Sequence, residues 1–431
     1  MRLILFLLTV FALFGCKNQI EPQQFCELAD IGAIGYQCDS LRSIGKHGKT
    51  AQLYFKTGEK NQSSELFVYS AWQFNEANNI DSALIAIKRA IDFGMSNPYV
   101  LDKVGINEQN KNNRIRKEVD QLLADIKLKN SSVDNFEVIT TPIDRFWTYY
   151  NQAINDSLNA KKHLTEFICD GSNAIKDYYH IRYENIDKMY RVMIKKNSKY
   201  YQYTKNHITS DKLKKISNES KEMMVKFSEL YPNAVFPKTY LIPDLINGSG
   251  TLTELGLFIG VTMFAKSDTM PTENLNDWQK NTITEFNNMK FDLVHELMHF
   301  QQSYGDSDNR NLLLGKLIEE GVCDFLVTLL TKNNEMSPVM QKRLNYVNNP
   351  ENMAFIMDEL KKDLYSSDLS KWMYNGGGIK DRPSNLGYTM GYLICKSYYE
   401  NSNDKKKAIF ELLNTNNFKK IIEESDFIEI L

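Results

Sequence analysis

Apolar residues recur at helical spacing along most of the chain, with one interruption of a different character. Residues 64–130 carry apolar side chains three or four positions apart, broken once, which predicts two packed helices. Residues 144–224 and the part from about Leu275 to the C-terminus show the same spacing. Between them, residues 238–265 carry short β-branched and aromatic runs around four glycines, which predicts strands joined by tight turns. The pattern therefore predicts an α+β protein with a small sheet.

Small residues line the first helical stretch at positions where two helices would approach closely. Ala71, Ala83 and Ala90 leave room for close packing, while Phe74 and Ile87 fill the groove between the helices. These positions resemble a tetratricopeptide repeat, of which only one copy is recognisable. An ordinary helical hairpin packed on the following domain explains the same positions equally well. Under either interpretation, this all-α region can bind a protein partner.

The first sixteen residues form a separate segment. Arg2 precedes an apolar run that is too short to span a bilayer. The run ends in LFGC, residues 13–16, which resembles the lipobox of bacterial lipoproteins. This resemblance implies cleavage before Cys16 and attachment of lipid to its sulfur, which would anchor the protein to a membrane outside the cytoplasm. The expected location is the periplasmic face of the outer membrane or the cell surface, and an ordinary cleaved signal peptide is the alternative.

These observations divide the chain into four parts. We expect a lipoprotein signal peptide in residues 1–15 and a tether with irregular structure in 16–50. A helical, tetratricopeptide-like domain is expected in 51–132, followed by the larger α+β domain in 133–431.

Composition changes this picture little. The net charge is −2 and 25% of the residues are charged, so nothing favours nucleic-acid binding. Cys26 and Cys38 are close enough in sequence to form a local disulfide, although they can equally remain unpaired. Cys169, Cys323 and Cys395 lie in apolar surroundings and are expected to be buried thiols.

The segment FDLVHELMHFQQ, residues 291–302, carries the most specific chemical signal. His295 and His299 are four positions apart, so on a helix both imidazoles lie on one face and can bind one ion. Glu296 follows the first histidine, at a position from which it can reach a metal-bound water and act as a general base. The pattern predicts a site for one Zn²⁺.

A catalytic zinc needs a third protein ligand. Glu320 lies on the same helical stripe as Leu317, which indicates the buried side, whereas Glu319 shares its stripe with Lys316. We therefore expect Glu320 to be the third ligand, with Glu319 as the alternative. Asp324, one turn after Glu320, can accept a hydrogen bond from the other ring nitrogen of a ligand histidine.

The order of these residues resembles the gluzincin metallopeptidases. More narrowly, the chain from about Thr141 onward is similar to predicted zinc-dependent proteases that occur as bacterial lipoproteins, with an opening like TPIDRFWTYYNQA and a turn like INGSGT. The resemblance implies a zincin-like domain that hydrolyses peptide bonds in a peptide or protein substrate. It also implies an edge strand at residues 255–264 that holds the substrate backbone. Tyr388 and Tyr392, one helical turn apart, are candidates for stabilising the oxyanion.

Two other functions remain open at this point. One is a non-catalytic binding lipoprotein with a structural metal, and the other is a metal-dependent hydrolase of non-peptide bonds. Glu296 argues against the first, because a structural site has no use for a general base.

Overall fold

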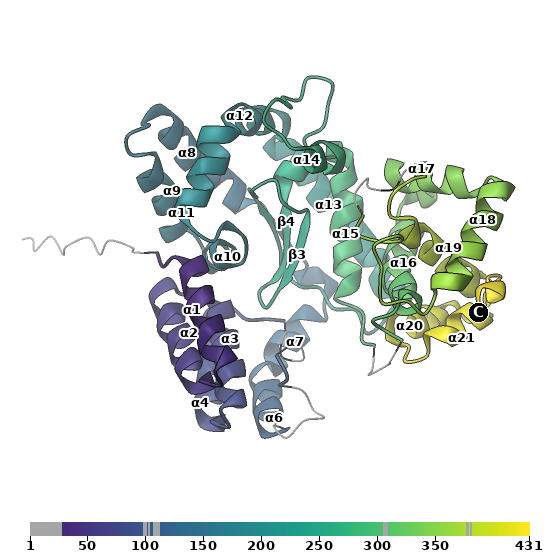
Figure 1. Ribbon diagram of the computed structural model, residues 1–431, viewed down its shortest axis with the longest axis horizontal. Coiled ribbons are helices and arrows are strands. Elements are labelled where there is room, and N and C mark those ends of the chain that lie inside the picture. The colour runs from purple at the N-terminus through teal and green to yellow at the C-terminus, as the bar shows by residue number, and fades with distance from the viewer. Residues whose placement is uncertain are drawn as a thin grey trace, which may run out of the picture.

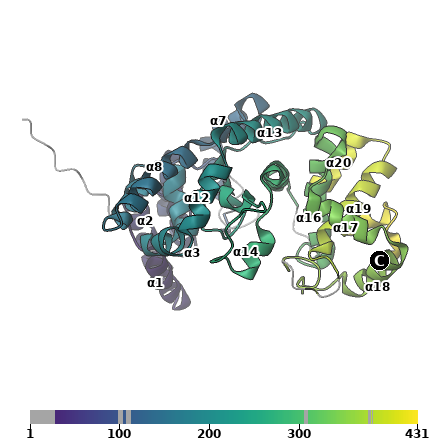
Figure 2. The same ribbon diagram turned by 90° about the horizontal axis from the view of Figure 1, so that it is seen from above.

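The computed structural model describes residues 28–97, 101, 104–106, 113–304, 309–375, 379 and 382–431. Figures 1 and 2 show helices on both sides of a small central sheet, with the N-terminal helices on one side and the C-terminal helices on the other. The expected α+β class is confirmed. In the described part of the chain, no helix is both long enough and apolar enough to cross a membrane.

The N-terminal helices begin earlier than expected. They are α1 (Ile31–Ser43), α2 (His47–Asn61), α3 (Ser64–Glu76) and α4 (Ile80–Asp92). Residues 31–43 were expected to be irregular but form α1, whose first turn is capped by the Asp30 carboxylate accepting the N–H of Ala33 at 3.1 Å. The prediction of an irregular segment is wrong for these residues.

The predicted hairpin is present as α3 and α4. Ala71, Ala83, Ile87 and Ala90 are fully buried and Phe74 is 8% exposed, as their spacing requires. Whether this hairpin is a tetratricopeptide unit stays a prediction. Two further helices, α6 (Asn113–Leu122) and α7 (Ala124–Asn130), lead towards the sheet.

Tyrosine hydroxyls attach the next helical layer to the sheet region. Tyr183 donates to the carbonyl of Pro243, and Tyr201 donates to the carbonyl of Asp244 at 2.6 Å. Both tyrosines are fully buried, so their hydroxyls need these acceptors. The helical elements of this layer are α8 (Thr141–Asn155), α9 (Ala160–Cys169), α10 (Asn173–Tyr178), η2 (Tyr179–Tyr183), α11 (Ile186–Met189), η3 (Tyr190–Lys196), α12 (Ser198–His207) and α13 (Ser210–Leu230).

The sheet has the strand order β1-β2-β4-β3. Its strands are β1 (Val138–Ile139), β2 (Thr239–Ile242), β3 (Gly250–Thr253) and β4 (Gly256–Gly260). β1, β2 and β4 run parallel, while β3 pairs antiparallel with β4. The edge strand was expected at 255–264, but β4 has a partner on each side, so the edge strand beside the metal centre is β3. Gly256 has φ +131°, and an added Cβ would lie 2.2 Å from the Lys238 carbonyl, so this turn requires glycine.

The C-terminal helices pack tightly around α16. An added Cβ at Gly391 would lie 1.9 Å from the Leu317 carbonyl, so α16 and α19 cross at backbone contact. This contact fixes the position of Glu320, which precedes Gly321 at the crossing. The helices that follow the sheet are α14 (Asp277–Thr282), α15 (Met289–His299), α16 (Leu313–Leu330), α17 (Pro338–Val347), α18 (Pro350–Asp363), α19 (Leu386–Asn401), α20 (Lys405–Asn414) and α21 (Phe418–Glu423). Of these, α15 packs on the sheet, and α17 to α21 lie with α16 in the C-terminal half. Single turns of 3-10 helix occur at η1 (Val133–Asn135), η4 (Val261–Phe264), η5 (Phe286–Asn288), η6 (Lys332–Asn334) and η7 (Ile428–Ile430).

Candidate metal centre

Two histidines of α15 and one glutamate of α16 converge on a single point. The Nε2 atom of His295 lies 3.3 Å from Oε2 of Glu320, and the Nε2 atom of His299 lies 3.5 Å from the same oxygen. α15 supplies both imidazoles from one face because they are four residues apart, as their spacing predicts. The two helices thus bring two nitrogens and one carboxylate together in a partly buried space.

The other ring nitrogens are held by separate acceptors. Nδ1 of His295 lies 2.8 Å from Oδ1 of Asp324, where the sequence placed it. Nδ1 of His299 lies 2.9 Å from Oε1 of Gln302, whose amide nitrogen donates to the Glu319 carbonyl. Each Nδ1–H can therefore act as a donor, so both Nε2 atoms face the Glu320 carboxylate. When protonated they donate to it, and when deprotonated they can bind a metal ion. Gln302 belongs to the segment 291–302, but the sequence did not predict its contact with His299, because that contact depends on how the chain bends after α15 ends.

The structure brings Glu320, rather than the alternative Glu319, to the histidines. Glu319 forms ion pairs with Lys316 at 2.5 Å and with Arg310 at 3.6 Å. Glu320 is 8% exposed and faces inward with the buried side of α16. Glu320 thus lies beside the histidines, as the helical stripe indicated, and its role as a metal ligand stays a prediction.

Electrostatics couple these groups strongly. Burial favours the neutral form of His295, but the carboxylates of Asp324 and Glu320 outweigh it and raise the pKa of this imidazole well above its ordinary value. Burial likewise opposes ionisation of Glu320, but hydrogen bonds from His295 and His299 lower its pKa below the usual range. A carboxylate and two imidazole nitrogens that face one point form a donor set that fits Zn²⁺.

Tyr374 closes the site on the side of the C-terminal helices. Its hydroxyl donates to Oε1 of Glu320 at 3.0 Å, although the side chain is 62% exposed. Its backbone has φ +58°, which is strained for an aromatic residue. Sequence reasoning missed Tyr374, because it lies in an irregular segment far along the chain from Glu320.

The two tyrosines chosen from the sequence lie in different places. The ring of Tyr388 is 6.3 Å from the ring of His295 and 6.2 Å from that of Tyr374, measured between centroids. Tyr392 is 2% exposed, and its hydroxyl has a hydrogen bond with Thr328, one turn after Asp324 on α16. Tyr388 therefore belongs to the wall of the site and Tyr392 to the core.

Two further side chains surround the histidines. The thiol of Cys323 lies 3.6 Å from Nδ1 of His299, the nitrogen already held by Gln302. The Cys323 thiol also lies 3.4 Å from the Glu319 carbonyl, so it sits on the Nδ1 side of His299 and not at the Nε2 atoms that face Glu320, and we do not count it among the proposed ligands. Burial raises the pKa of this thiol well above its ordinary value. Glu296 packs against β3, since an added Cβ at Gly250 would lie 2.4 Å from its carboxyl carbon.

A family model described as gliding motility protein GldB matches residues 112–428 of the 431-residue chain. The chain belongs to the GldB family. Neither the curated proteins nor the solved structures include a significant match. Helices α1 to α4 precede the region that the GldB model matches.

The expectation of a gluzincin-type zinc metallopeptidase is therefore wrong. The GldB family is characterised by gliding motility, and no finding supports proteolysis or another hydrolytic activity. The HExxH spacing places two imidazoles on one helix face whatever the site does, so the motif specified a geometry and not a reaction. The catalytic roles expected for Glu296, Tyr388 and Tyr392 depended on that activity and are not retained.

Membership in this lipoprotein family agrees with a lipid-anchored, extracytoplasmic protein. The apolar N-terminal run and Cys16 lie outside the described residues. Cys169 is disulfide-bonded rather than a buried thiol, which fits an oxidising compartment. Cys38 is a free buried thiol and is therefore not paired with Cys26.

Proposed function

We propose that this protein is a non-catalytic lipoprotein of the gliding apparatus, stabilised by one structural Zn²⁺ bound to His295, His299 and Glu320. Membership in the GldB family supports its place in gliding motility. The convergence of two imidazole nitrogens on one carboxylate oxygen supports the metal. Lipid on Cys16 would hold the protein at the periplasmic face of the outer membrane or at the cell surface.

A zinc ion at this point would connect the two halves of the molecule. α15 packs on the sheet through β3 and β4, whereas α16 packs on α19, α20 and α21. Without a metal, the contact between these halves would depend at this point on hydrogen bonds between buried charged groups, which contribute little net stability. With the metal, its binding free energy becomes part of the free energy of folding.

The surroundings of the site favour a structural use. β3 covers Glu296 on one side, and Tyr374 covers Glu320 on the other. A structural zinc site is closed to solvent, whereas a catalytic one keeps a position open for water and substrate.

The N-terminal helices are the proposed site for a protein partner. A groove between α2 and α4 is lined by Phe55, Phe74 and Ile85, with Lys56 at its side. Ile85 is 54% exposed there, so apolar surface is available to a partner.

Complementation of a non-gliding deletion strain tests the non-catalytic role. Glu296→Gln keeps the shape of the side chain but removes its ability to act as a base, and we expect it to restore gliding as the wild type does. His299→Ala and Glu320→Ala are expected to fail and to lower the amount of folded protein. Loss of gliding in Glu296→Gln, with normal protein amount and normal zinc content, would contradict the proposal.

A further inference from the structure

Positive charge is concentrated in one part of a chain whose net charge as a whole is nearly zero. Residues 160–207 hold ten Lys and Arg against five Asp and Glu, while the whole chain has a net charge of −2. One of the five acids, Asp177, is fully buried. Neither the metal centre nor the partner groove uses this charge.

The charge lies on a face formed by α9, α11 and η3, which pack against one another. We define the basic face by its exposed residues Lys161, Lys162, Arg191, Lys195 and Lys196. Lys161 and Lys195 each place Nζ 5.5 Å from the ring centroid of Tyr190. An aromatic ring between ammonium groups is a common composition at a bilayer surface.

Some of these charges are neutralised within the protein and others are not. Lys161 pairs with Asp187 at 2.7 Å, and Lys162 lies 3.9 Å from Glu166. Among the described residues, Arg191, Lys195 and Lys196 have no acidic partner. The basic face therefore offers an anionic surface three positive charges without a direct ion pair, of which Arg191 shares a cleft with Asp30, Glu184 and Asp187.

An exposed leucine projects beside the basic face. Leu158, in the turn between α8 and α9, is 96% exposed. The turn is fixed by Asp156, whose carboxylate accepts from the Asn159 amide at 3.0 Å and pairs with His163 at 3.2 Å. A single exposed leucine is not unusual, but one held next to Lys161 and Lys162 has the composition of an interfacial insertion site.

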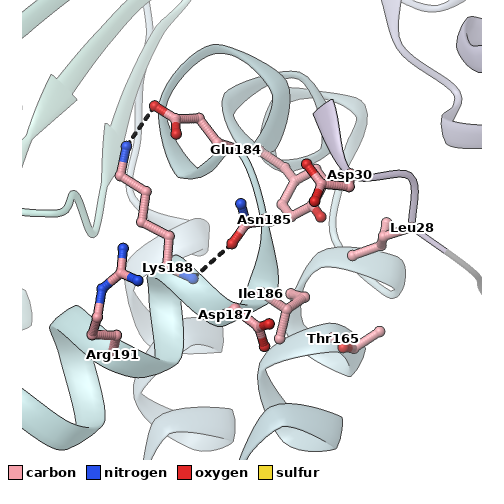
Figure 3. Close-up of a pocket in the computed structure, with 10 residues that line it drawn as sticks. Leu28, Asp30, Thr165, Glu184, Asn185, Ile186, Asp187, Lys188 and Arg191 are labelled. Atoms are coloured by element: carbon pink, nitrogen blue, oxygen red, sulfur yellow. Dashed lines mark hydrogen bonds and ion pairs between the residues drawn. The ribbon is translucent and has the colours of Figure 1, made fainter. Parts of the chain in front are cut away.

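The N-terminal segment reaches the body of the protein at this same face. Figure 3 shows Leu28 and Asp30 across a cleft from Lys188 and Arg191. The amide of Ile31 donates to the carbonyl of Glu184 at 3.2 Å, which fixes this entry point. From Cys16 to Leu28 the chain can extend at most about 40 Å, so a lipid on Cys16 keeps this face close to a bilayer.

We infer that the basic face and Leu158 dock directly on an anionic phospholipid bilayer, with Leu158 inserted among the headgroups. The inference rests on the proposed lipid anchor, which brings this face within reach of the membrane. Docking would hold the molecule in one orientation, with the C-terminal helices directed away from the bilayer (Figure 1). The partner groove and the metal centre would then stay accessible above the membrane.

Vesicle co-sedimentation of the mature chain tests this without the lipid. The protein begins at residue 16 and carries Cys16→Ser, so any binding comes from the folded body. We expect binding to vesicles of phosphatidylglycerol and phosphatidylcholine in equal parts, weakened by salt, and little binding to phosphatidylcholine alone. Lys196→Glu should weaken binding by about fivefold or more, since each basic residue near an anionic surface contributes on the order of 1 kcal/mol. Leu158→Glu should weaken it at least as strongly.

Two matched variants serve as controls. Leu128, 74% exposed on α7, and Lys342, exposed on α17, lie away from the basic face. Leu128→Glu and Lys342→Glu are expected to bind vesicles as the wild type does. Equal binding to both vesicle types, or equal losses in the controls, would overturn the inference. If the folded body binds vesicles but mass spectrometry of the cellular protein finds no lipid on Cys16, the proposal of a lipid anchor is wrong, while the inference that the basic face binds bilayers is kept.

Discussion

Two groups of buried or partly buried carboxyl side chains in the described part of the chain differ in what faces them. In the metal centre, Glu320 and Asp324 face the imidazoles of His295 and His299. In a second group, Glu65, Asp177 and Glu254 lie near one another, and no basic side chain contributes to their pKa shifts. We call this second group the acid cluster. Facing imidazoles thus lower the pKa of Glu320, whereas burial without such partners raises the pKa of the acids in the second group.

The acid cluster joins three distant segments. Glu65 comes from α3, Asp177 from α10 and Glu254 from the turn between β3 and β4. Burial raises the pKa of Glu65 to about 8 and that of Asp177 to about 7. Burial also raises the pKa of Glu254 well above its ordinary value, and Glu254 shares a hydrogen bond with Asp177. Tyr69 donates to Glu65 at 2.6 Å, and Ser63 donates to Asp177 at 2.5 Å.

The difference shows how the partner of a buried acid decides its charge. Where imidazoles are present, ionised carboxylates and their partners can bind a cation. Where only hydroxyls and other carboxyls are present, the charged form is too costly and a proton remains. The first arrangement suits a metal, and the second ties the N-terminal helices to the sheet only while the acids stay protonated.

Among these predictions, removing the charge of Glu320 should have the largest effect, which is on zinc binding at the metal centre. Glu320→Gln preserves the size of the side chain but removes the anionic ligand. We expect the zinc affinity to fall by more than about a hundredfold, since even groups outside the ligand set contribute about 10- to 100-fold. Competition with a chromophoric chelator measures this. Glu319→Gln, one residue earlier and paired with Lys316, should leave the affinity unchanged.

Raising the pH should destabilise the acid cluster. The carboxyls ionise near pH 4 in the unfolded chain but only near pH 7 to 8 when folded, so the native state holds more protons between these values. This contribution to stability is therefore fully present below about pH 4, falls as the pH rises towards 7 to 8, and changes no further above that. Each such carboxyl contributes a slope of about 1.4 kcal/mol per pH unit in the free energy of unfolding. Denaturant titrations at a series of pH values measure the slope.

A neutral donor should flatten this pH dependence. Glu254→Gln supplies an amide N–H to Asp177 at every pH, so the slope above pH 5 should decrease. Glu59→Gln is the control, because the Glu59 carboxylate is partly exposed and pairs with Arg89, which lowers its pKa. If the free energy of unfolding of Glu254→Gln depended on pH as steeply as that of the wild type, the acid cluster would not cause the loss of stability as the pH rises.

Neutralising Asp324 should have an intermediate effect. Asp324→Asn can still accept from Nδ1 of His295, but without charge. We expect a loss of about tenfold in zinc affinity, the lower end of the range for groups that orient a ligand histidine. The same chelator competition applies, and an affinity equal to that of the wild type would show that Asp324 does not support the ligand.

Removing the hydroxyl of Tyr374 should have the smallest effect. Tyr374→Phe deletes one hydrogen bond to Glu320 from a side chain that is largely exposed. A single bond of this kind contributes about 1 kcal/mol, so zinc should dissociate roughly fivefold faster. Stopped-flow release into excess chelator measures the rate.

The sequence predicted those parts that follow from local periodicity. The stripe shared by Leu317, Glu320 and Asp324 selected the glutamate that faces the histidines, because all three lie on one helix. The glycines of residues 238–265 likewise indicated the strands and their turns. Helix α1 was missed because its two glycines weaken the helical pattern of the sequence. In the structure, the Asp30 cap supports its first turn.

Contacts between distant segments were not predictable in this way. Tyr374 meets Glu320 only through the packing of the C-terminal helices, and Asp177 meets Glu254 only through the fold. The activity was also mispredicted, because the spacing of His295 and His299 constrains where nitrogens lie but not whether a substrate is cleaved. Family membership, which depends on the whole pattern of residues 112–428, corrected it.

The zinc content of the purified protein tests the central claim most directly. Elemental analysis of the wild type, alongside the double variant His295→Ala/His299→Ala, counts the metal bound per chain. We predict one zinc per wild-type chain and none in the double variant, with chelation of the wild type lowering its melting temperature. A wild-type chain that is fully folded and binds no zinc, even after incubation with the metal, would contradict the account.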